Sequence, residues 1–453
     1  MSQDLTKGSI PKHILRMSLP TMSGLLFQAL YDIVDMIWIG RISYSAVASV
    51  TIFVSLFWLF EVVNSIIGIS SVSLISQSFG AGNKERTKKA AEQTLTFKFS
   101  VAILAASILW ILLIPLLRLF TNDALVIEQA VAYGRPRVLF IPIFFSSFSV
   151  NTIFRCTGDA KTPMYLLIGS AILNIILDPV MMFDQIPGTS IPGLGMGLYG
   201  AAMATNISFS LSFIIGLVIL FKGTKRIKIS IRGLFVLDRE IDKKLLTIGL
   251  PSGMEMLFRN AANSLLIRMV GIYGVAAIAL IGVGTRIYSF MMMPLLGILM
   301  GSGTIAGQNL GAEQVDRAKS TARYSALLGM VIATVFSLVI VICAEDILGL
   351  FLTDLSNMQE GILMMRIVAP SLIVAAFSFG IASSLSGAGH NIPFFYSCII
   401  GKWVIMIPYV AITIYIFQAP LAFIWISFWL SEIAEGIVLY HSYRRGTWIK
   451  KRV

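Results

Sequence analysis

The stretch QSFGAGNKERTK at residues 77–88 has a related copy 231 residues later, QNLGAEQVDRAK at residues 308–319. Glutamine, glycine, alanine, arginine and lysine recur at matching positions, and a general bias toward apolar residues does not explain such a match. The same offset pairs further residues of the two halves: Pro20 with Pro251, Phe27 with Phe258, Gly40 with Gly271, Arg135 with Arg366 and Gly158 with Gly389. The sequence therefore predicts an internal duplication.

The composition indicates the class of protein to which the duplicated chain belongs. Of 453 residues, 57% are hydrophobic and only 13% are charged, whereas soluble globular chains average about 45–50% apolar and about 25% charged residues. This excludes an ordinary soluble enzyme, a disordered protein and a nucleic-acid binder. The chain is predicted to be an integral membrane protein, with the lipid bilayer as its surroundings.

Apolar runs long enough to cross a bilayer as helices alternate with charged or Gly/Pro-containing segments. We expect spans near residues 13–38, 46–78, 95–118, 130–155, 162–183, 198–221, 246–270, 275–307, 321–344, 360–387, 392–416 and 419–442. A β-barrel is excluded because its strands are about ten residues of alternating polarity. The prediction is an all-α integral membrane protein with twelve transmembrane helices.

The charges of the loops predict the orientation and the domains. Lys and Arg concentrate in the loops on one side, including residues 79–94, the linker and the C-terminal tail, so both termini are expected in the cytoplasm. Six spans per half make the repeat parallel, with its axis along the membrane normal. The predicted domains are an N-terminal six-helix lobe (1–221), a cytoplasmic linker (222–245) and a C-terminal six-helix lobe with a basic tail (246–453).

Such pseudo-symmetric lobes favour a secondary transporter. The sequence has no GxxxxGK[ST] phosphate-binding loop, so an ion gradient rather than ATP is the expected energy source. His13, His390 and His441 lie in loops or near span ends, which argues against a membrane-embedded enzyme. Cys156, Cys343 and Cys398 have no metal or redox spacing, and they are expected to be inert.

Polar side chains inside the first-half spans need a reason, because a charge at mid-bilayer costs at least about 2.5 kcal/mol on insertion scales. Counting about 1.5 Å per residue from the outer loops places several of them about 9–10 Å below the outer surface. The group that is expected to form one pocket comprises Asp35, Asp178, Thr205 and Tyr133, with Asp32 on the helix face of Asp35 and Asn174 on that of Asp178. Its oxygens suit Na⁺, and its two carboxylates equally suit a shared H⁺.

Structural roles remain open for these acids: Asp35 or Asp178 could cap a neighbour or satisfy a helix kink, and Asp32 could face the outer vestibule. The offset of 231 maps Asp35 to Leu266 and Asp178 to Tyr409, so the acid cluster is not duplicated. The second-half spans instead carry charges of both signs: Glu255, Arg259, Arg286, Lys402, Glu432 and Glu435. We expect a structural or gating ion-pair network, with Glu255 as the group that contacts a cationic substrate.

Several stretches together resemble the multidrug and toxic compound extrusion (MATE) family over essentially the whole chain. They are LPTMSGLLFQALYDIVDMIWIG (19–40), SQSFGAGNKERTKKA (76–90), ILNIILDP (172–179), GLGMGLYGAAMATNIS (193–208) and GLPSGMEMLFRN (249–260). The resemblance implies an antiporter that exports organic, often cationic and aromatic, compounds in exchange for H⁺ or Na⁺ by alternating access. It implies no enzyme activity, no cofactor, a working monomer and a place in the prokaryotic inner membrane.

The family's first-lobe cation site matches Asp35, Tyr133, Asn174 and Asp178, and less closely Thr205; with Na⁺ the ligands would be Asp35, Asn174, Asp178 and Thr205. The tenth span has no acid in its core, and Arg259 stands where a second-lobe acid is expected, so the chain looks more like the DinF-like branch. An alternative is a flippase of lipid-linked saccharides, in which Arg259, Arg286 and Lys402 would bind a pyrophosphate. The native substrate and the coupling ion cannot be deduced from the sequence.

Overall fold

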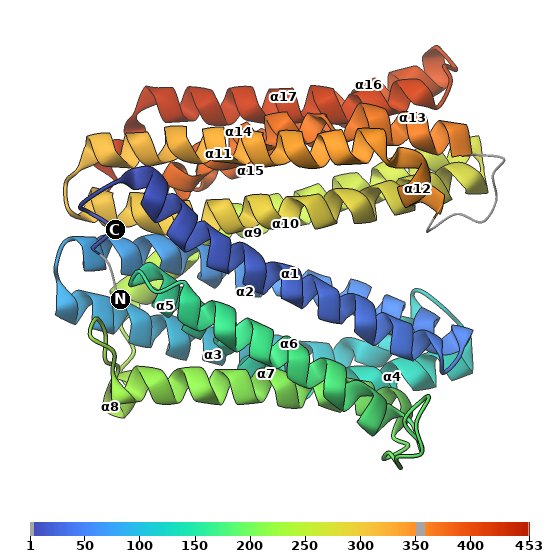
Figure 1. The fold of residues 1–453 in the computed structure, drawn as a ribbon, viewed down its shortest axis with the longest axis horizontal. Helices are drawn as coiled ribbons and strands as arrows, with labels where there is room; N and C mark the ends of the chain where they lie inside the picture. Colours follow the sequence, from blue (N-terminus) through green and yellow to red (C-terminus); the bar gives the residue numbers. More distant parts are fainter. Residues whose placement is uncertain (1–3, 350–357, 452) are drawn as a thin grey trace. The chain divides into compact units, whose positions relative to one another are not determined.

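The structure is a computed structural model that describes residues 4–349, 358–451 and 453. The described residues form helices joined by short loops, one of which holds an isolated antiparallel bridge between Gln185 and Pro192. The chain divides into two compact units. The first contains residues 23–249, and the second contains residues 4–22 together with the described residues from 250 onward (Figure 1).

The helices of the first unit follow one another closely along the chain. They are α1 (Ile10–Gly40, from residue 23 on), α2 (Tyr44–Gly80), α3 (Lys84–Arg118), α4 (Ala124–Leu139), α5 (Ile141–Cys156), α6 (Lys161–Met182), α7 (Gly197–Lys222), the short α8 (Ile231–Leu234) and the start of α9 (Arg239–Val270).

The second unit has more broken helices. It contains the rest of α1 and α9, then η1 (Gly271–Tyr273), α10 (Val275–Gly311), α11 (Val315–Ile342), α12 (Ala344–Gly349), α13 (Met358–Val368), α14 (Ser371–Gly387), α15 (Ile392–Cys398), the π-helix η3 (Ile399–Met406), α16 (Ile407–Ala411), the π-helix η4 (Ile412–Ile416), α17 (Ala422–Arg445) and η5 (Thr447–Lys450).

Ten helical segments of the described residues are long and apolar enough to span a membrane, and the pair α4–α5, bent by 50°, makes an eleventh. Helix α9 corresponds to the remaining predicted span, near residues 246–270. Its 32 residues are ample for a span, which needs about 20, but Glu255, Arg259 and Arg268 lower its hydropathy. The all-α membrane fold predicted from the sequence is therefore confirmed.

Three helices begin earlier than the apolar runs predicted: α3 at Lys84, α9 at Arg239 and α11 at Val315. The prediction that 79–94 is a loop is thus wrong over most of its length. Lys, Arg and Glu are good helix formers, and the Asn83 side chain accepts a hydrogen bond of 2.9 Å from the Arg86 backbone N–H. This N-cap starts α3 in the basic segment.

The fourth predicted span is two helices rather than one. It breaks at Phe140, between α4 and α5. Pro142 has no backbone N–H to donate to residue 138, so the regular hydrogen-bond ladder is interrupted there. The break turns the pair by 50°.

The compact units differ from the predicted lobe ranges at the first helix of each half. Residues 4–22 belong to the second unit and residues 239–249 to the first. The N-terminal segment is fastened to α10 and α11: Arg317 Nη1 donates to the Gly8 carbonyl at 2.9 Å, and Asn309 Nδ2 donates to the Leu5 carbonyl at 3.3 Å. These contacts join the start of the chain to the second unit.

Part of the predicted linker packs on α3. The Glu92 carboxylate, which is buried, accepts hydrogen bonds from the Ser230 backbone N–H at 2.7 Å and from the Ser230 hydroxyl at 2.9 Å. Lys89 forms an ion pair with Asp238, and its hydrogen bond lowers the pKa of the Asp238 carboxyl. The linker is therefore bonded to the first unit.

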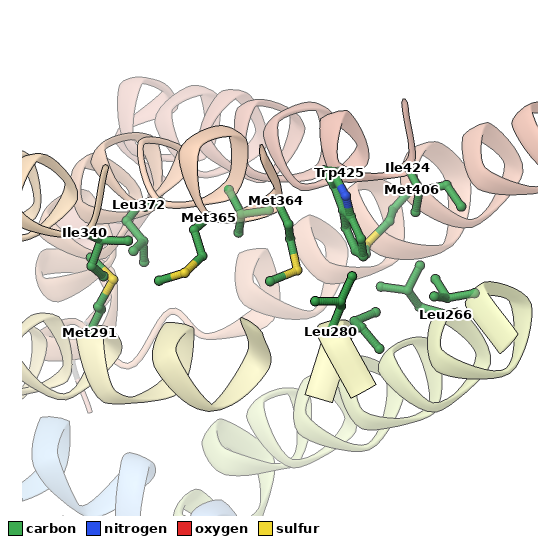
Figure 2. Close-up of a cluster of buried hydrophobic side chains, with 14 of the residues drawn as sticks. Leu266, Leu280, Met291, Ile340, Met364, Met365, Leu372, Met406, Ile424 and Trp425 are labelled. Atoms are coloured by element: carbon green, nitrogen blue, oxygen red, sulfur yellow. The ribbon is translucent and has the colours of Figure 1, made fainter. Parts of the chain in front are cut away.

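Each unit has its own apolar core. The core of the second unit gathers Met364 of α13, Met406 of η3, Trp425 of α17 and Leu280 of α10 (Figure 2). Methionine is unbranched and fills irregular gaps, which suits helices that are interrupted by π-turns. Phe53, Leu109 and Phe145 belong to the core of the first unit.

Helices α11 and α14 pack closely at Gly380. A Cβ atom on this glycine would overlap the backbone of Ala326 on α11. Gly282 on α10 is also helical but has open space where a Cβ would lie. The two glycines therefore form a matched pair for testing this packing.

We predict that Gly380→Ala destabilises the protein by about 1–3 kcal/mol because the added methyl group forces α11 and α14 apart. Gly282→Ala should be neutral or stabilising, since alanine is the better helix former by up to about 1 kcal/mol. Thermal unfolding of both variants in the same detergent measures the difference. Equal melting temperatures would show that α11 and α14 do not pack closely at Gly380.

Candidate functional site

Three helices of the first unit bring together the polar side chains that the sequence placed at one depth. Asn174 and Asp178 lie one turn apart on α6, and Asn174 Nδ2 donates to Asp178 Oδ1 at 3.1 Å and to Thr205 Oγ1 of α7 at 3.3 Å. Asp35 of α1 lies within electrostatic range of Asp178. All four side chains are buried.

Three oxygen atoms of this group have no hydrogen-bond donor in the described part of the chain. They are Asp35 Oδ1, Asn174 Oδ1 and Asp178 Oδ2. A buried acceptor without a partner costs about 1–3 kcal/mol, and more if it is charged. Carboxylate, amide and hydroxyl oxygens are the ligands of hard cations, and two close carboxylates can share a proton. We call Asp35, Asn174, Asp178 and Thr205 the acid cluster.

The other two predicted members of the site differ from one another. Tyr133 of α4 is buried within electrostatic range of Asp35 and Asp178, and its ring packs edge-on against Phe53 at 5.5 Å between centroids. Asp32 is exposed, although it lies only three residues from Asp35. The structure therefore places Tyr133 beside the acid cluster and leaves Asp32 more exposed than Asp35.

Arg137 of α4 is a candidate residue that the sequence analysis missed. Its charge is within electrostatic range of Asp35, and its guanidinium lies 5.5 Å from the ring centroids of both Phe57 and Phe144. Its Nη1 also donates to Asn206 Oδ1 at 3.4 Å. The cation–π contacts hold a positive charge beside the acid cluster. Its position near the end of a predicted span instead suggests a side chain that extends toward the membrane surface.

A second buried polar group in the first unit joins Glu61, one of the acids within the predicted spans, to a lysine that had not been singled out. Lys98 of α3 is 1% exposed and lies within electrostatic range of Glu61 on α2. Glu61 Oε1 accepts a hydrogen bond of 2.5 Å from Asn64 Nδ2. The signal in the sequence is a lone lysine within the apolar run LTFKFSVAIL.

The mixed charges of the second unit form an ion-pair network. Arg259 Nε lies 2.5 Å from Glu255 Oε1, one turn earlier on α9, and Arg259 Nη2 lies 2.7 Å from Glu435 Oε2 on α17. Lys402 Nζ lies 3.4 Å from both Glu435 Oε1 and Glu432 Oε1. These three carboxylates and two cations leave one net negative charge, and we call them the ion-pair network.

A π-helix supplies the lysine of this network. Lys402 belongs to η3, and the wider turn of a π-helix changes the direction of side chains relative to an α-helix. Tyr288 of α10 also joins, since its hydroxyl donates to Glu432 Oε1 at 3.1 Å. Arg286 is exposed and forms no ion pair within the described ranges, so it lies outside the network that was predicted to contain it.

The fold and these sites define an integral membrane protein of two duplicated helical halves with buried charge clusters. The profile of the MatE family matches residues 20–180 and 251–412. The two matches begin 231 residues apart, as the repeat found in the sequence does. The chain belongs to the MatE family, and the predicted MATE family is confirmed.

Known proteins match the chain along its whole length. It is 28% identical over 456 residues to the probable multidrug resistance protein YoeA of Bacillus subtilis, covering 100% of this chain and 97% of that protein. It is 23% identical to the probable multidrug resistance protein NorM of Thermotoga maritima, covering 99% and 96%. A solved structure of a MOP superfamily transporter from Pyrococcus furiosus has the same fold, with a TM-score of 0.91 at 24% identity, covering 99% of this chain and 98% of that chain. These proteins agree with the prediction of a transporter rather than an enzyme.

We predict that Arg259→Gln destabilises the protein by about 3–5 kcal/mol, because Glu255 and Glu435 lose their common partner while Glu435 stays buried. Arg268→Gln is the matched control, since Arg268 is exposed on the same helix. Thermal unfolding with tryptophan fluorescence measures both. If the two variants unfold at the same temperature, the ion-pair network does not stabilise the second unit.

Proposed function

We propose that the chain is a secondary multidrug antiporter, which exports organic compounds, often cationic and aromatic, in exchange for H⁺ or Na⁺. Membership of the MatE family and the names of its multidrug resistance relatives support this proposal. The observation that carries it is the acid cluster with its three unpartnered oxygens. Those oxygens need a cation or protons to offset their burial.

The proposed coupling of ion and substrate transport follows from the charges of the acid cluster. Two carboxylates within electrostatic range repel one another, so a bound cation stabilises the state in which Asp35 and Asp178 approach. Antiport requires that the ion and the substrate oppose one another's binding. In the proposed cycle, the outward-facing state takes up the ion and releases the substrate, and the inward-facing state does the reverse.

Both ions remain candidates within this proposal. Asn174, Thr205 and the carboxylates offer the oxygen ligands of a Na⁺ site, whereas Asp35 and Asp178 alone suffice for H⁺. Among the residues that the structure describes, no group of three or more His, Cys, Asp or Glu side chains could hold a metal ion. A Na⁺ site thus depends on amide and hydroxyl oxygens.

The alternative of a lipid-linked saccharide flippase gains no support. Of the three cations that would have to bind a pyrophosphate, Arg286 is exposed and forms no ion pair among the described residues, whereas Arg259 and Lys402 each lie within ion-pair distance of carboxylates in a network with net negative charge. Such a network repels an anionic group.

Within the ion-pair network, Glu255 has a partly exposed side chain. We propose that Glu255 contacts the cationic substrate. A role of Asp32 beside Asp35 also stays a prediction.

The proposal includes the finer predictions about branch and location. We infer a DinF-like transporter that works as a monomer in the prokaryotic inner membrane, with both termini in the cytoplasm. Coupling through the first unit supports the branch, because the acid cluster lies there. The basic loop segments support the orientation.

The test is dye efflux from proteoliposomes under a separately imposed H⁺ or Na⁺ gradient. We expect one gradient to drive efflux, and Asp35→Asn and Asp178→Asn each to lower the rate at least about tenfold, as loss of an essential charged group costs more than ~1.4 kcal/mol. Asp316→Asn is the matched control, because that side chain is fully exposed. Folded protein that moves no cationic dye under either gradient would refute the antiport proposal.

Arg137→Gln provides a second test. Removing a positive charge near Asp35 should favour cation binding by ~1 kcal/mol at an effective dielectric constant of about 20, so the ion concentration for half-maximal efflux should fall about fivefold. Arg135→Gln on the same helix is the control, since Arg135 is exposed and lies over Trp110. An unchanged or higher half-maximal concentration would contradict an electrostatic role for Arg137.

A further inference from the structure

A cavity in the second unit is separate from both charge clusters. It has a volume of about 700 Å³ and lies among α11, α14 and α17. Its polar lining comes from Arg323 and Tyr324 of α11 and from Tyr440, Tyr443 and Arg444 of α17. The volume is within the range of about 300–1,000 Å³ that is typical of small-molecule sites.

The two arginines give one end of the cavity a positive charge. Arg323 and Arg444 are exposed, and neither forms an ion pair with any residue that the structure describes. No carboxylate lines the cavity. Guanidinium groups bind phosphate oxygens in a bidentate manner, so this end is suited to a phosphate group.

The other end of the cavity is apolar. Leu327 and Met330 lie one and two turns beyond Arg323 on α11, and they line this end of the cavity together with Phe377 of α14. The ring of Phe377 lies 5.9 Å from that of Tyr440. The cavity thus passes from a cationic end to an apolar one along the helix axis, as the headgroup and acyl chain of a lipid do.

The position along the helices fits a lipid of one leaflet. Arg323 follows Arg317 and Lys319 near the start of α11, and Arg444 lies in the last turn of α17, next to the basic C-terminal tail. Both therefore belong to the end of the unit that the loop charges assign to the cytoplasm. Tyrosines are enriched at this depth of a membrane because their rings are apolar and their hydroxyl groups are polar.

We propose that this cavity binds an anionic phospholipid of the cytoplasmic leaflet, with its phosphate between Arg323 and Arg444 and one acyl chain along Leu327, Met330 and Phe377. Basic pockets between transmembrane helices on this side are suited to anionic headgroups. A zwitterionic lipid carries its own cation, which the two arginines repel. The site selects an anionic lipid by charge and a lipid over a free anion by its apolar end.

Native mass spectrometry of the delipidated full-length protein tests this proposal. The probes are phosphatidylglycerol and phosphatidylcholine with identical acyl chains, each titrated into the detergent solution. We expect at least one phosphatidylglycerol to bind about tenfold more tightly than phosphatidylcholine, which corresponds to ~1.4 kcal/mol. Arg323→Gln/Arg444→Gln should abolish this preference.

The matched control is Arg445→Gln/Lys450→Gln, which removes two positive charges from exposed positions at the same end of the unit but outside the cavity. It should keep the preference for phosphatidylglycerol. Leu327→Trp is a charge-neutral second variant, because Leu327 is 56% exposed and a larger ring fills the apolar end. It should weaken phosphatidylglycerol binding even if the arginine variant fails to fold.

Several results would overturn the proposal. Equal binding of the two lipids would show ordinary annular contact, and an equal loss in the control variant would show a general charge effect. If inorganic phosphate at millimolar concentration displaces phosphatidylglycerol, the site is an anion site without an acyl-chain pocket. An unchanged affinity of Leu327→Trp for phosphatidylglycerol would also show that no acyl chain occupies the apolar end.

Discussion

Burying a polar group without a hydrogen-bond or ion-pair partner is costly, and the two halves of this protein meet this constraint in different ways. In a helix bundle that lies in lipid, no water satisfies a side chain from outside. The ion-pair network of the second unit meets the constraint internally, since Arg259 and Lys402 are shared among Glu255, Glu432 and Glu435. In the first unit, Asp35, Asn174 and Asp178 each keep an oxygen without a donor. The charges of the ion-pair network thus compensate one another, whereas the acid cluster keeps acceptors that a cation would satisfy in the proposed antiport cycle.

This difference arose on a duplicated framework. The positions that carry Asp35 and Asp178 in the first half correspond to Leu266 and Tyr409 in the second. Leu266 is 2% exposed in the apolar core of the second unit, and Tyr409 packs against the same core. Where one half has acids, the other has hydrophobic packing, and its charges lie elsewhere, on α9, η3 and α17. The duplication therefore preserved the helix order and not the chemistry of the site.

The sequence was sufficient where local spacing determines the result. Apolar runs predicted the spans, the offset of 231 predicted the duplicated halves, and four-residue spacing predicted the Asn174–Asp178 pair. The sequence was insufficient where the position of a side chain depends on an irregular helix or on aromatic rings from other helices. Lys402 joins its carboxylates through a π-helix, which no periodicity in the sequence reveals. Arg137 lies beside the acid cluster because Phe57 and Phe144, from two other helices, hold its guanidinium. The early starts of α3, α9 and α11 were missed because charged residues form helices outside an apolar run as readily as loops.

The division of α1 between the two units connects the acid cluster to the rest of the protein. Residues 10–22 of this helix belong to the second unit, while Asp35 lies in the part that belongs to the first. Helix α9 is divided in the same way at residue 250, and each division falls within three residues of a helix-interior proline, Pro20 or Pro251. A proline removes one backbone hydrogen bond, so a helix bends there at the lowest cost. In the proposed antiport cycle, a cation that draws Asp35 toward Asp178 therefore acts on a helix whose other part is packed in the second unit. In that cycle, the proline near the division is the place where α1 would bend most easily when the ion binds.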